Sequence, residues 1–257
     1  MKGNMPMRTS LLAALALALT APGLAADAPA AQSRLGKGYL EPAALPDSLV
    51  LLPPPPVAGS AAETRDREAA AAAVGQRGTP RWQLATRDAD LFSPAATGAF
   101  SCAAGVEIGP KTTPRLDALL RRTLPDLGLA SYAAKTRYQR TRPFVVNGEP
   151  NCTPEASAML AKDGSYPSGH ASIGFGWGLI LAELIPARAT QLAARGHEFA
   201  DSRRFCNVHW LSDVEAGQVV AAATVARLHA EPAFRKDLDA VRKELRRAPH
   251  APAGCGA

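Results

Sequence analysis

Hydrophobic residues recur at the three- and four-residue spacing of helices along most of this chain, and no stretch alternates as strands do. A stripe of leucines predicts a helix over 113–124, with Pro114 near its start. From 170 to 185 nearly every residue is apolar or small, which predicts a helix buried on most sides. Further helices are expected over 61–91 (two, divided at 75–80), 132–141, 187–200, 212–229 and 232–247. The expected fold class is all-α.

Local signals set several of these helix ends. Pro143 is expected to end the helix over 132–141 at or before Arg142. Ser212 and Glu215 have the spacing of a capping box, which predicts where the helix over 212–229 begins. Ser168 is a natural N-cap for the apolar helix, whose free first-turn amides favour an anion.

The N-terminal segment 1–25 has the pattern of a secretory signal. Lys2 and Arg8 precede an apolar run over 11–19 and a small-residue site ending at Ala25, where cleavage is expected. The run is too short for a membrane span. The whole chain carries 29 basic and 23 acidic residues, a net charge of +6, and the signal holds two of the basic ones and no acidic one. The mature balance is only mildly basic, so no nucleic-acid partner is expected.

The rest of the chain divides into three expected parts. Residues 26–60 are rich in Ala and Pro and include four consecutive prolines at 53–56. They are interpreted either as a polyproline-II arm that lies on the body or on a partner subunit, or as a flexible linker. A single helical domain is expected over 61–247, followed by a Pro/Gly/Ala tail over 248–257.

Four cysteines stand at 102, 152, 206 and 255. An even number in a chain expected to be exported indicates two disulfides, with three connectivities open and buried free thiols as the alternative. A bridge at Cys206 would fix the loop that carries His209.

The segment 202–213 holds the strongest candidate chemistry. His209 and Asp213 are four residues apart, so in a helix they would lie on one face, where a carboxylate orients an imidazole. Nearby Arg203 offers a planar cation suited to phosphate oxygens. Lys135 and Arg142 are seven apart and are expected to share another helix face. Between them, the arginines at 137 and 140 are interpreted as surface or structural charges. His209 is expected to be a nucleophile that attacks phosphorus.

Three segments of the chain resemble the three-part signature of the type-2 phosphatidic acid phosphatase superfamily, which includes the vanadium haloperoxidases. They are Lys135-(six)-Arg142-Pro143, then Pro167-Ser168-Gly169-His170, then Ser202-Arg203-(five)-His209-(three)-Asp213. Longer stretches such as PDSLVLLPPPP and GSYPSGHASIGFGWGLILAE are similar to the bacterial class A non-specific acid phosphatases in particular, and this likeness runs from about Leu40 to Lys236. Ala171 departs from the threonine usual in that class, which affects substrate preference more than chemistry.

The resemblance implies a single-domain helical bundle and a role for each residue of the signature. His209 would form a phosphohistidine, Asp213 would orient it, and His170 would protonate the leaving oxygen and then activate water. The phosphoryl oxygens would be held by Lys135, Arg142, Ser168, Gly169 and Arg203. The resemblance also places Cys152 with Cys206 and, by extension, Cys102 with Cys255.

The implied protein is a periplasmic, metal-independent acid phosphatase with no cofactor, acting on many small phosphomonoesters. Its activity is expected to follow a bell-shaped pH profile on the acidic side of neutral. Transfer of the phosphoryl group to an alcohol is a side activity that a phosphoenzyme allows, and the proline-rich arm and the family likeness indicate a homo-oligomer.

Three other functions were weighed. A vanadate-dependent haloperoxidase would bind vanadate in the same oxyanion cradle with His209 as its ligand. A lipid phosphatase is disfavoured because membrane members of the superfamily carry several long apolar helices, which this sequence lacks. A non-catalytic phosphate-binding protein would need Arg203 and Lys135 but neither histidine.

Overall fold

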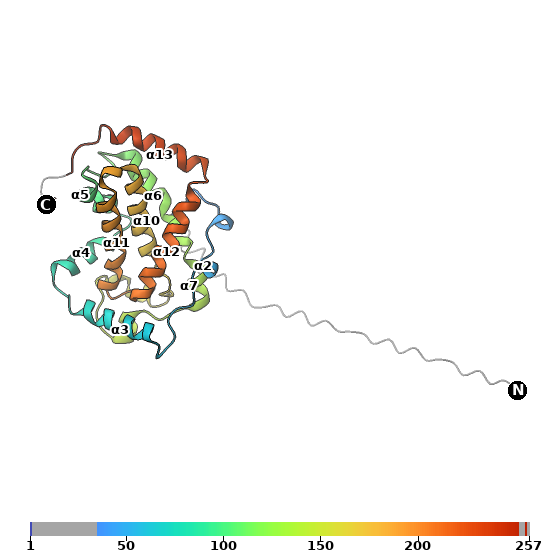
Figure 1. Ribbon diagram of the computed structural model, residues 1–257. Helices are drawn as coiled ribbons and strands as arrows, with labels where there is room; N and C mark the ends of the chain where they lie inside the picture. The colour runs from blue at the N-terminus through green and yellow to red at the C-terminus, as the bar shows by residue number, and fades with distance from the viewer. Residues whose placement is uncertain (2–34, 252–254, 256–257) are drawn as a thin grey trace.

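The computed structural model describes Met1, residues 35–251 and Cys255; the predicted signal, apart from Met1, lies outside the described residues. Helix α10 (Gly169–Leu184) runs through the centre of the molecule. Around it pack α6 (Pro114–Leu129), α11 (Ala189–Phe205) and α12 (Leu211–Leu228), as Figure 1 shows. The described residues form no strand beyond one isolated bridge, between Val106 and His250. The expected all-α class is confirmed.

Shorter helices close the ends and one side of this bundle. Helix α13 (Pro232–Leu245) crosses one end, α3 (Ala61–Val74) the other, and α4 (Pro80–Asp88) packs on α11 (Figure 1). None of the helices in the described part of the chain is long and apolar enough to cross a membrane. The remaining elements are η1 (Pro42–Ala44), α2 (Ser48–Leu51), η2 (Ala96–Phe100), α5 (Ser101–Ala104), α7 (Tyr132–Tyr138), α8 (Pro143–Asn147), η3 (Pro154–Ala156), α9 (Ser157–Leu160) and η4 (Pro186–Arg188).

The apolar helix α10 supplies the middle of the core, as its composition predicts. Trp177 is fully buried, packs against Phe100 and Phe199, and donates its indole N–H to the carbonyl of Leu120 at 2.9 Å. A buried indole needs such a partner, because an unpaired N–H in the core is costly. This contact therefore fixes α10 against α6.

Close packing of α10 on α11 depends on two glycines. A Cβ added at Gly178 would lie 2.8 Å from the Cα of Gly196 and 2.9 Å from the carbonyl oxygen of Leu192. Both contacts are backbone atoms, which cannot move aside as a side chain can. At this point the two helices are in backbone contact.

Gly178→Ala is therefore expected to destabilise the protein by about 1–3 kcal/mol, although alanine normally favours a helix over glycine by about 1 kcal/mol. Urea unfolding measures the change. Gly75→Ala is the matched control, because Gly75 has an ordinary helical φ of −62° and its added Cβ would approach nothing closer than 3.4 Å. A Gly178→Ala protein as stable as the control would contradict the contact.

Three helix ends differ from the prediction. Helix α6 continues past Pro125 to Leu129, because packing of the fully buried Leu127 offsets the proline's lost hydrogen bond. Helix α7 ends at Tyr138, because Gln139 takes the left-handed conformation with φ of 43°. Helix α11 runs on to Phe205 and so carries Arg203.

The described part of the proline-rich arm, residues 35–60, lies on the helical body. Asp126 of α6 accepts hydrogen bonds from the amides of Tyr39 and Leu40, both at 2.9 Å. Tyr166 donates its hydroxyl to the carbonyl of Pro53 at 2.8 Å, beside the start of α10. The arm thus contacts the same end of α10 that carries the candidate site residues.

The structure contains two disulfides. Cys102 pairs with Cys255, and Cys152 pairs with Cys206, with Cα–Cα distances of 5.1 and 4.8 Å. These are the pairings that the resemblance implies. The second ties the loop after α8 to the end of α11, just before His209.

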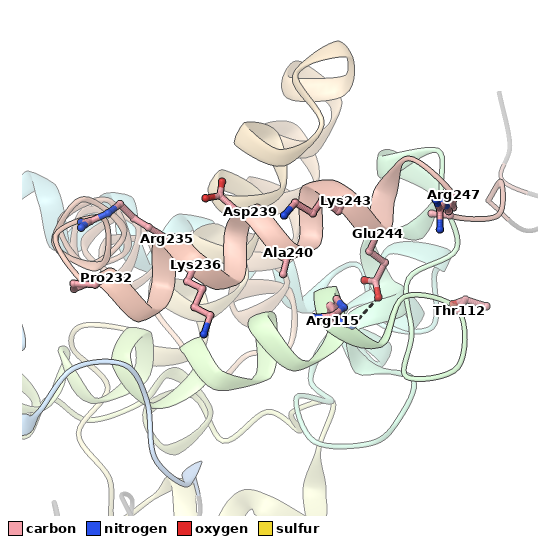
Figure 2. Close-up of a pocket in the computed structure, with 11 residues that line it drawn as sticks. Thr112, Arg115, Pro232, Arg235, Lys236, Asp239, Ala240, Lys243, Glu244 and Arg247 are labelled. Carbon is pink, nitrogen blue, oxygen red and sulfur yellow. Dashed lines mark hydrogen bonds between the residues drawn. The ribbon is translucent and has the colours of Figure 1, made fainter.

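An open groove of about 910 Å³ lies between α13 and the start of α6 (Figure 2). Five of its eleven lining residues are basic, including Arg115, Lys236 and Lys243. Glu244 caps α6 through the amides of Arg115 and Leu116. None of the candidate site residues lines it.

Candidate active site

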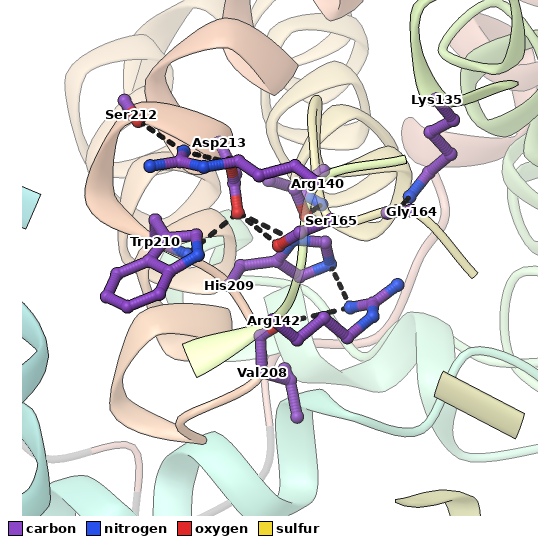
Figure 3. Close-up of polar contacts among 12 residues, drawn as sticks. Lys135, Arg140, Arg142, Gly164, Ser165, Val208, His209, Trp210, Ser212 and Asp213 are labelled. Atoms are coloured by element: carbon purple, nitrogen blue, oxygen red, sulfur yellow. Dashed lines mark hydrogen bonds and ion pairs between the residues drawn. The ribbon is translucent and has the colours of Figure 1, made fainter. Parts of the chain in front are cut away.

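The three motif segments converge on His209, which lies in the turn between α11 and α12. Figure 3 shows Arg142 of the first segment and Asp213 of the third beside its ring. Arg142, just before α8, contacts the His209 ring. Ser168, the N-cap of α10, donates its amide to the carbonyl oxygen of Asp213 at 2.9 Å. Residues from α7 to α12, distant in sequence, therefore form one buried site.

The hydrogen bonds of His209 fix its tautomer. Its Nε2 lies 2.9 Å from Nη1 of Arg142, which can only donate, so Nε2 accepts and carries the lone pair. Its Nδ1 lies 3.4 Å from a carboxylate oxygen of Asp213 and therefore carries the hydrogen. The lone pair on Nε2 points into the group of cations, as a nucleophile for phosphorus requires.

Asp213 lies beside the His209 ring from the first turn of α12, and the two residues do not share a helix face. His209 precedes α12, while Asp213 is its third residue and accepts the amide of Trp210 at 2.8 Å. The carboxylate also accepts from Nη1 of Arg140 at 2.6 Å and from the hydroxyl of Ser165. With several donors on a fully buried carboxylate, its position beside the ring is fixed.

The predicted capping box is also wrong, because Ser212 and Glu215 bond to α3 instead. Asp66 of α3 accepts both the amide and the hydroxyl of Ser212, at 2.8 and 2.6 Å. Glu215 forms an ion pair with Arg65. The start of α12 is therefore capped locally by Asp213 and is also bonded to α3, a contact that no local pattern reveals.

Lys135 and Arg142 do not share a helix face, because α7 ends between them. They meet through the segment after α9. Nζ of Lys135 donates to the carbonyl of Gly164 at 2.6 Å, and Arg142 donates from Nη2 to the carboxylate of Asp163 at 2.9 Å. Arg142 also donates to the carbonyl of Val208 at 2.9 Å. Both cations are buried beside His209 as expected, but the segment after α9 brings them together instead of a shared helix face.

Arg203 is the third cation, and it differs from the other two. It is 5% exposed, and within the described part of the chain its Nε and Nη1 have no hydrogen-bond partner. A buried guanidinium with free donors is costly, so this one indicates a binding site for an anion. Burial, with Arg142 close by, lowers its pKa, and a bound anion would reverse that effect.

Both site histidines are held in the neutral form. Burial lowers the pKa of His209 well below the ordinary 6.5, and the charges of Arg142, Lys135 and Arg203 lower it further. Burial and Arg203 do the same to the pKa of His170. Burial also lowers the pKa of Lys135, to about 8.

His170 is oriented by the backbone at the end of α4. Its Nε2 lies 2.7 Å from the carbonyl oxygen of Asp88, which can only accept, so Nε2 carries a hydrogen and Nδ1 is left for a substrate. The ring stacks on Phe199, with centroids 5.4 Å apart. Asp88 in turn is held by Ser202 and Arg195. The imidazole is therefore fixed on two sides.

Gly169, expected to let a ligand approach the backbone, has a packing role as well. A Cβ there would lie 2.9 Å from the hydroxyl of Ser131 and 3.3 Å from the carbonyl of Gly128. Glycine thus allows α10 to start close against the end of α6. Its amide remains in the first turn of the helix, where an anion is favoured.

Sequence reasoning missed the polar residues that support the site. Of the two alternatives given for Arg140, the structural one applies, since its side chain is 13% exposed and joins Asp213 to Asp66 of α3. Ser165 and Asp163 were assigned no role from the sequence. Their one sequence signal is position, since they lie within or beside the motif segments.

Among the described residues, no group of three or more His, Cys, Asp or Glu side chains could hold a metal ion.

Comparisons with known proteins agree with this site. The chain matches the PAP2 superfamily over residues 126–235. It is 40% identical over 206 residues to an acid phosphatase of Zymomonas mobilis, covering 79% of this chain and 76% of that protein. It is 45% identical over 181 residues to a non-specific acid phosphatase of Salmonella typhimurium (70% and 72%), and 40% over 208 residues to one of Providencia stuartii (80% and 84%).

The chain therefore belongs to the PAP2 superfamily, and within it to the group of the non-specific acid phosphatases. It is an acid phosphatase, which confirms the family and the type of enzyme expected from the motifs.

Proposed function

We propose that this acid phosphatase hydrolyses a broad range of small phosphomonoesters through a phosphohistidine on Nε2 of His209, without a metal ion. The observation that carries the proposal is the lone pair of a neutral, buried His209 aimed among three cations, one of which has unused donors. The cations supply the charge stabilisation that phosphoryl transfer needs.

In the first step Nε2 of His209 attacks phosphorus, the bond to the ester oxygen breaks, and the N–P bond forms. The departing oxygen takes a proton from Nδ1 of His170. Asp213 stabilises the positive ring through Nδ1 of His209, 3.4 Å away. In the second step His170 takes a proton from water, whose oxygen attacks phosphorus and breaks the N–P bond. Inorganic phosphate leaves and both histidines are restored.

His170 must carry a proton in the first step, although its pKa is depressed in the empty site. Arg203 is one cause of that depression, and a phosphate dianion bound to Arg203 would offset its charge. The pKa of His170 is therefore expected to rise when substrate binds. Substrate binding would thus favour the protonated form of the general acid.

The test is p-nitrophenyl phosphate hydrolysis by protein dialysed against EDTA, from about pH 4 to 8. Activity should survive dialysis, peak on the acidic side of neutral, and be inhibited by vanadate, an oxyanion of similar shape. Activity that disappears with EDTA and returns with a divalent cation would contradict the metal-free mechanism.

The pH dependence of kcat/KM tests the electrostatics of the empty site. His209 must be neutral to attack, and its lowered pKa keeps it neutral as the pH falls below 6.5, so the acid limb should lie below that value. His170 must be protonated, and its pKa is also lowered, so activity should first fall just above its acidic peak. Lys135 must be charged as well, so a further alkaline limb is expected near its pKa of about 8. Lys135→Arg keeps the cation at higher pH and should move the alkaline limb upward. A limb that stays in place would exclude Lys135 as its source.

The support that Arg140 gives to Asp213 is tested by Arg140→Gln. Loss of this contact frees the carboxylate to move, and kcat should fall about ten- to a hundredfold with little change in KM, since small displacements of a catalytic group are costly. Arg137→Gln is the control, because Arg137 is exposed on the neighbouring helix. Circular dichroism verifies folding, and equal kcat values for the two variants would refute the role.

Three further properties belong to the same proposal. Export to the periplasm is supported by the signal pattern of residues 1–25. Self-association is supported by exposed apolar side chains on the arm and beside it, Leu49, Val50 and Val57. Phosphotransfer to alcohols follows from a covalent phosphoenzyme that nucleophiles other than water can intercept. Cell fractionation, light scattering and product analysis in glycerol test them separately.

A further inference from the structure

The Asp163 carboxylate contacts two of the three cations that are proposed to hold the phosphoryl group. Its Oδ2 accepts from Nη2 of Arg142 at 2.9 Å and lies 3.4 Å from Nζ of Lys135. These are the N–H groups that the proposed function assigns to the phosphoryl oxygens. Since each donor points at one acceptor at a time, phosphate and the Asp163 carboxylate exclude each other there.

The carboxylate is not what holds the two cations in place. Nε of Arg142 donates to the carbonyl oxygens of Leu160 and Asp163, at 2.7 and 3.1 Å. Nζ of Lys135 donates to the carbonyl of Gly164 at 2.6 Å. These backbone contacts position both cations without the Asp163 side chain. What that side chain adds is negative charge.

Within the described part of the chain, the third cation forms no ion pair of this kind. Arg203 keeps unpartnered donors, while Asp163 is 32% exposed at its side chain and free to turn toward solvent. An arriving phosphate can therefore bind Arg203 first and then compete for Arg142 and Lys135. With two negative charges against one, it replaces the carboxylate.

We propose that Asp163 is a displaceable internal counter-ion of the phosphate site, an inference that rests on the proposed phosphatase function. Its carboxylate neutralises Lys135 and Arg142 while the site is empty. It gives way when the phosphoryl group of a substrate binds, and it returns to those N–H groups as inorganic phosphate leaves. Asp163 thereby limits the affinity for product and speeds its release.

The test is inhibition by inorganic phosphate in Asp163→Asn, which removes the charge and keeps the shape. Without the competing carboxylate, phosphate should bind more tightly. The inhibition constant should be about five- to tenfold lower, as expected for the loss of a partly exposed ion pair. Glu155→Gln is the matched control. It removes the same charge from an exposed residue of η3, on the other side of α9, and should change the constant less than about twofold.

The direction in which the inhibition constant changes separates a displaceable counter-ion from a residue that only supports the structure. If Asp163 merely supported Arg142, its loss would weaken phosphate binding. An unchanged or higher inhibition constant in Asp163→Asn therefore overturns the proposal. Asp163→Ser removes the same charge with a different side chain, and its inhibition constant is expected to fall as well. It replaces Asp163→Asn in the test if the asparagine variant does not fold.

Thermal unfolding in increasing phosphate measures the same affinity without catalysis. A larger stabilisation of Asp163→Asn than of wild type supports the counter-ion, and an equal or smaller one overturns it. Hydrolysis that persisted in His209→Ala would refute the proposed phosphohistidine mechanism. It would not bear on the counter-ion proposal, because phosphate binding is measured separately.

Discussion

His209→Ala is expected to lower kcat for p-nitrophenyl phosphate by about 10⁴-fold or more, because it removes the atom that bonds to phosphorus. Wild-type protein mixed with substrate and quenched should show an added phosphoryl group by mass spectrometry. The variant should show none.

His197→Ala is the matched control for this loss. His197 is an exposed histidine on α11 that hydrogen-bonds to Gln218 of α12 and belongs to none of the three motif segments. It should retain wild-type kcat. Because His209 is 3% exposed, the stability of both variants must also be compared. A folded His209→Ala protein that kept even a hundredth of wild-type kcat would require another nucleophile.

The sequence identifies the reacting groups because local spacing places them. Ser168 caps α10, and His170 follows in its first turn, so the order of residues alone puts serine, amide and imidazole together. His209 and Asp213 are likewise joined by one short turn. Where side chains come together through neighbours in sequence, the pattern of residues predicts that they do.

The supporting contacts could not be predicted in this way. Asp66 and Arg140 are separated by 74 residues, and Asp163 reaches Arg142 across 21. None of these residues belongs to a local motif. They contact the site only because α3 and the loop after α9 pack against it. The failed capping box shows the same limit, since Ser212 matches a local rule but bonds to Asp66 instead.

His170→Ala should show a loss that depends on the leaving group. Alkyl phosphates leave as strongly basic alkoxides and need the proton, so their hydrolysis should slow by about 10²–10⁴-fold. The p-nitrophenolate ion leaves readily without a proton, so its departure in the first step should slow far less. Rapid-quench kinetics on both substrates measures this difference.

The second step gives the decisive signature, because the same imidazole also activates water. In His170→Ala the phosphoenzyme should form from p-nitrophenyl phosphate and then persist, giving a burst of nitrophenolate followed by a slow steady state. The carbonyl of Asp88 holds Nε2 of His170 at 2.7 Å, so Nδ1 has to serve both steps. Equal losses on the two substrates with no burst would mean that His170 acts before the chemistry, in binding. A burst confined to the aryl substrate would instead assign both proton transfers to this one ring.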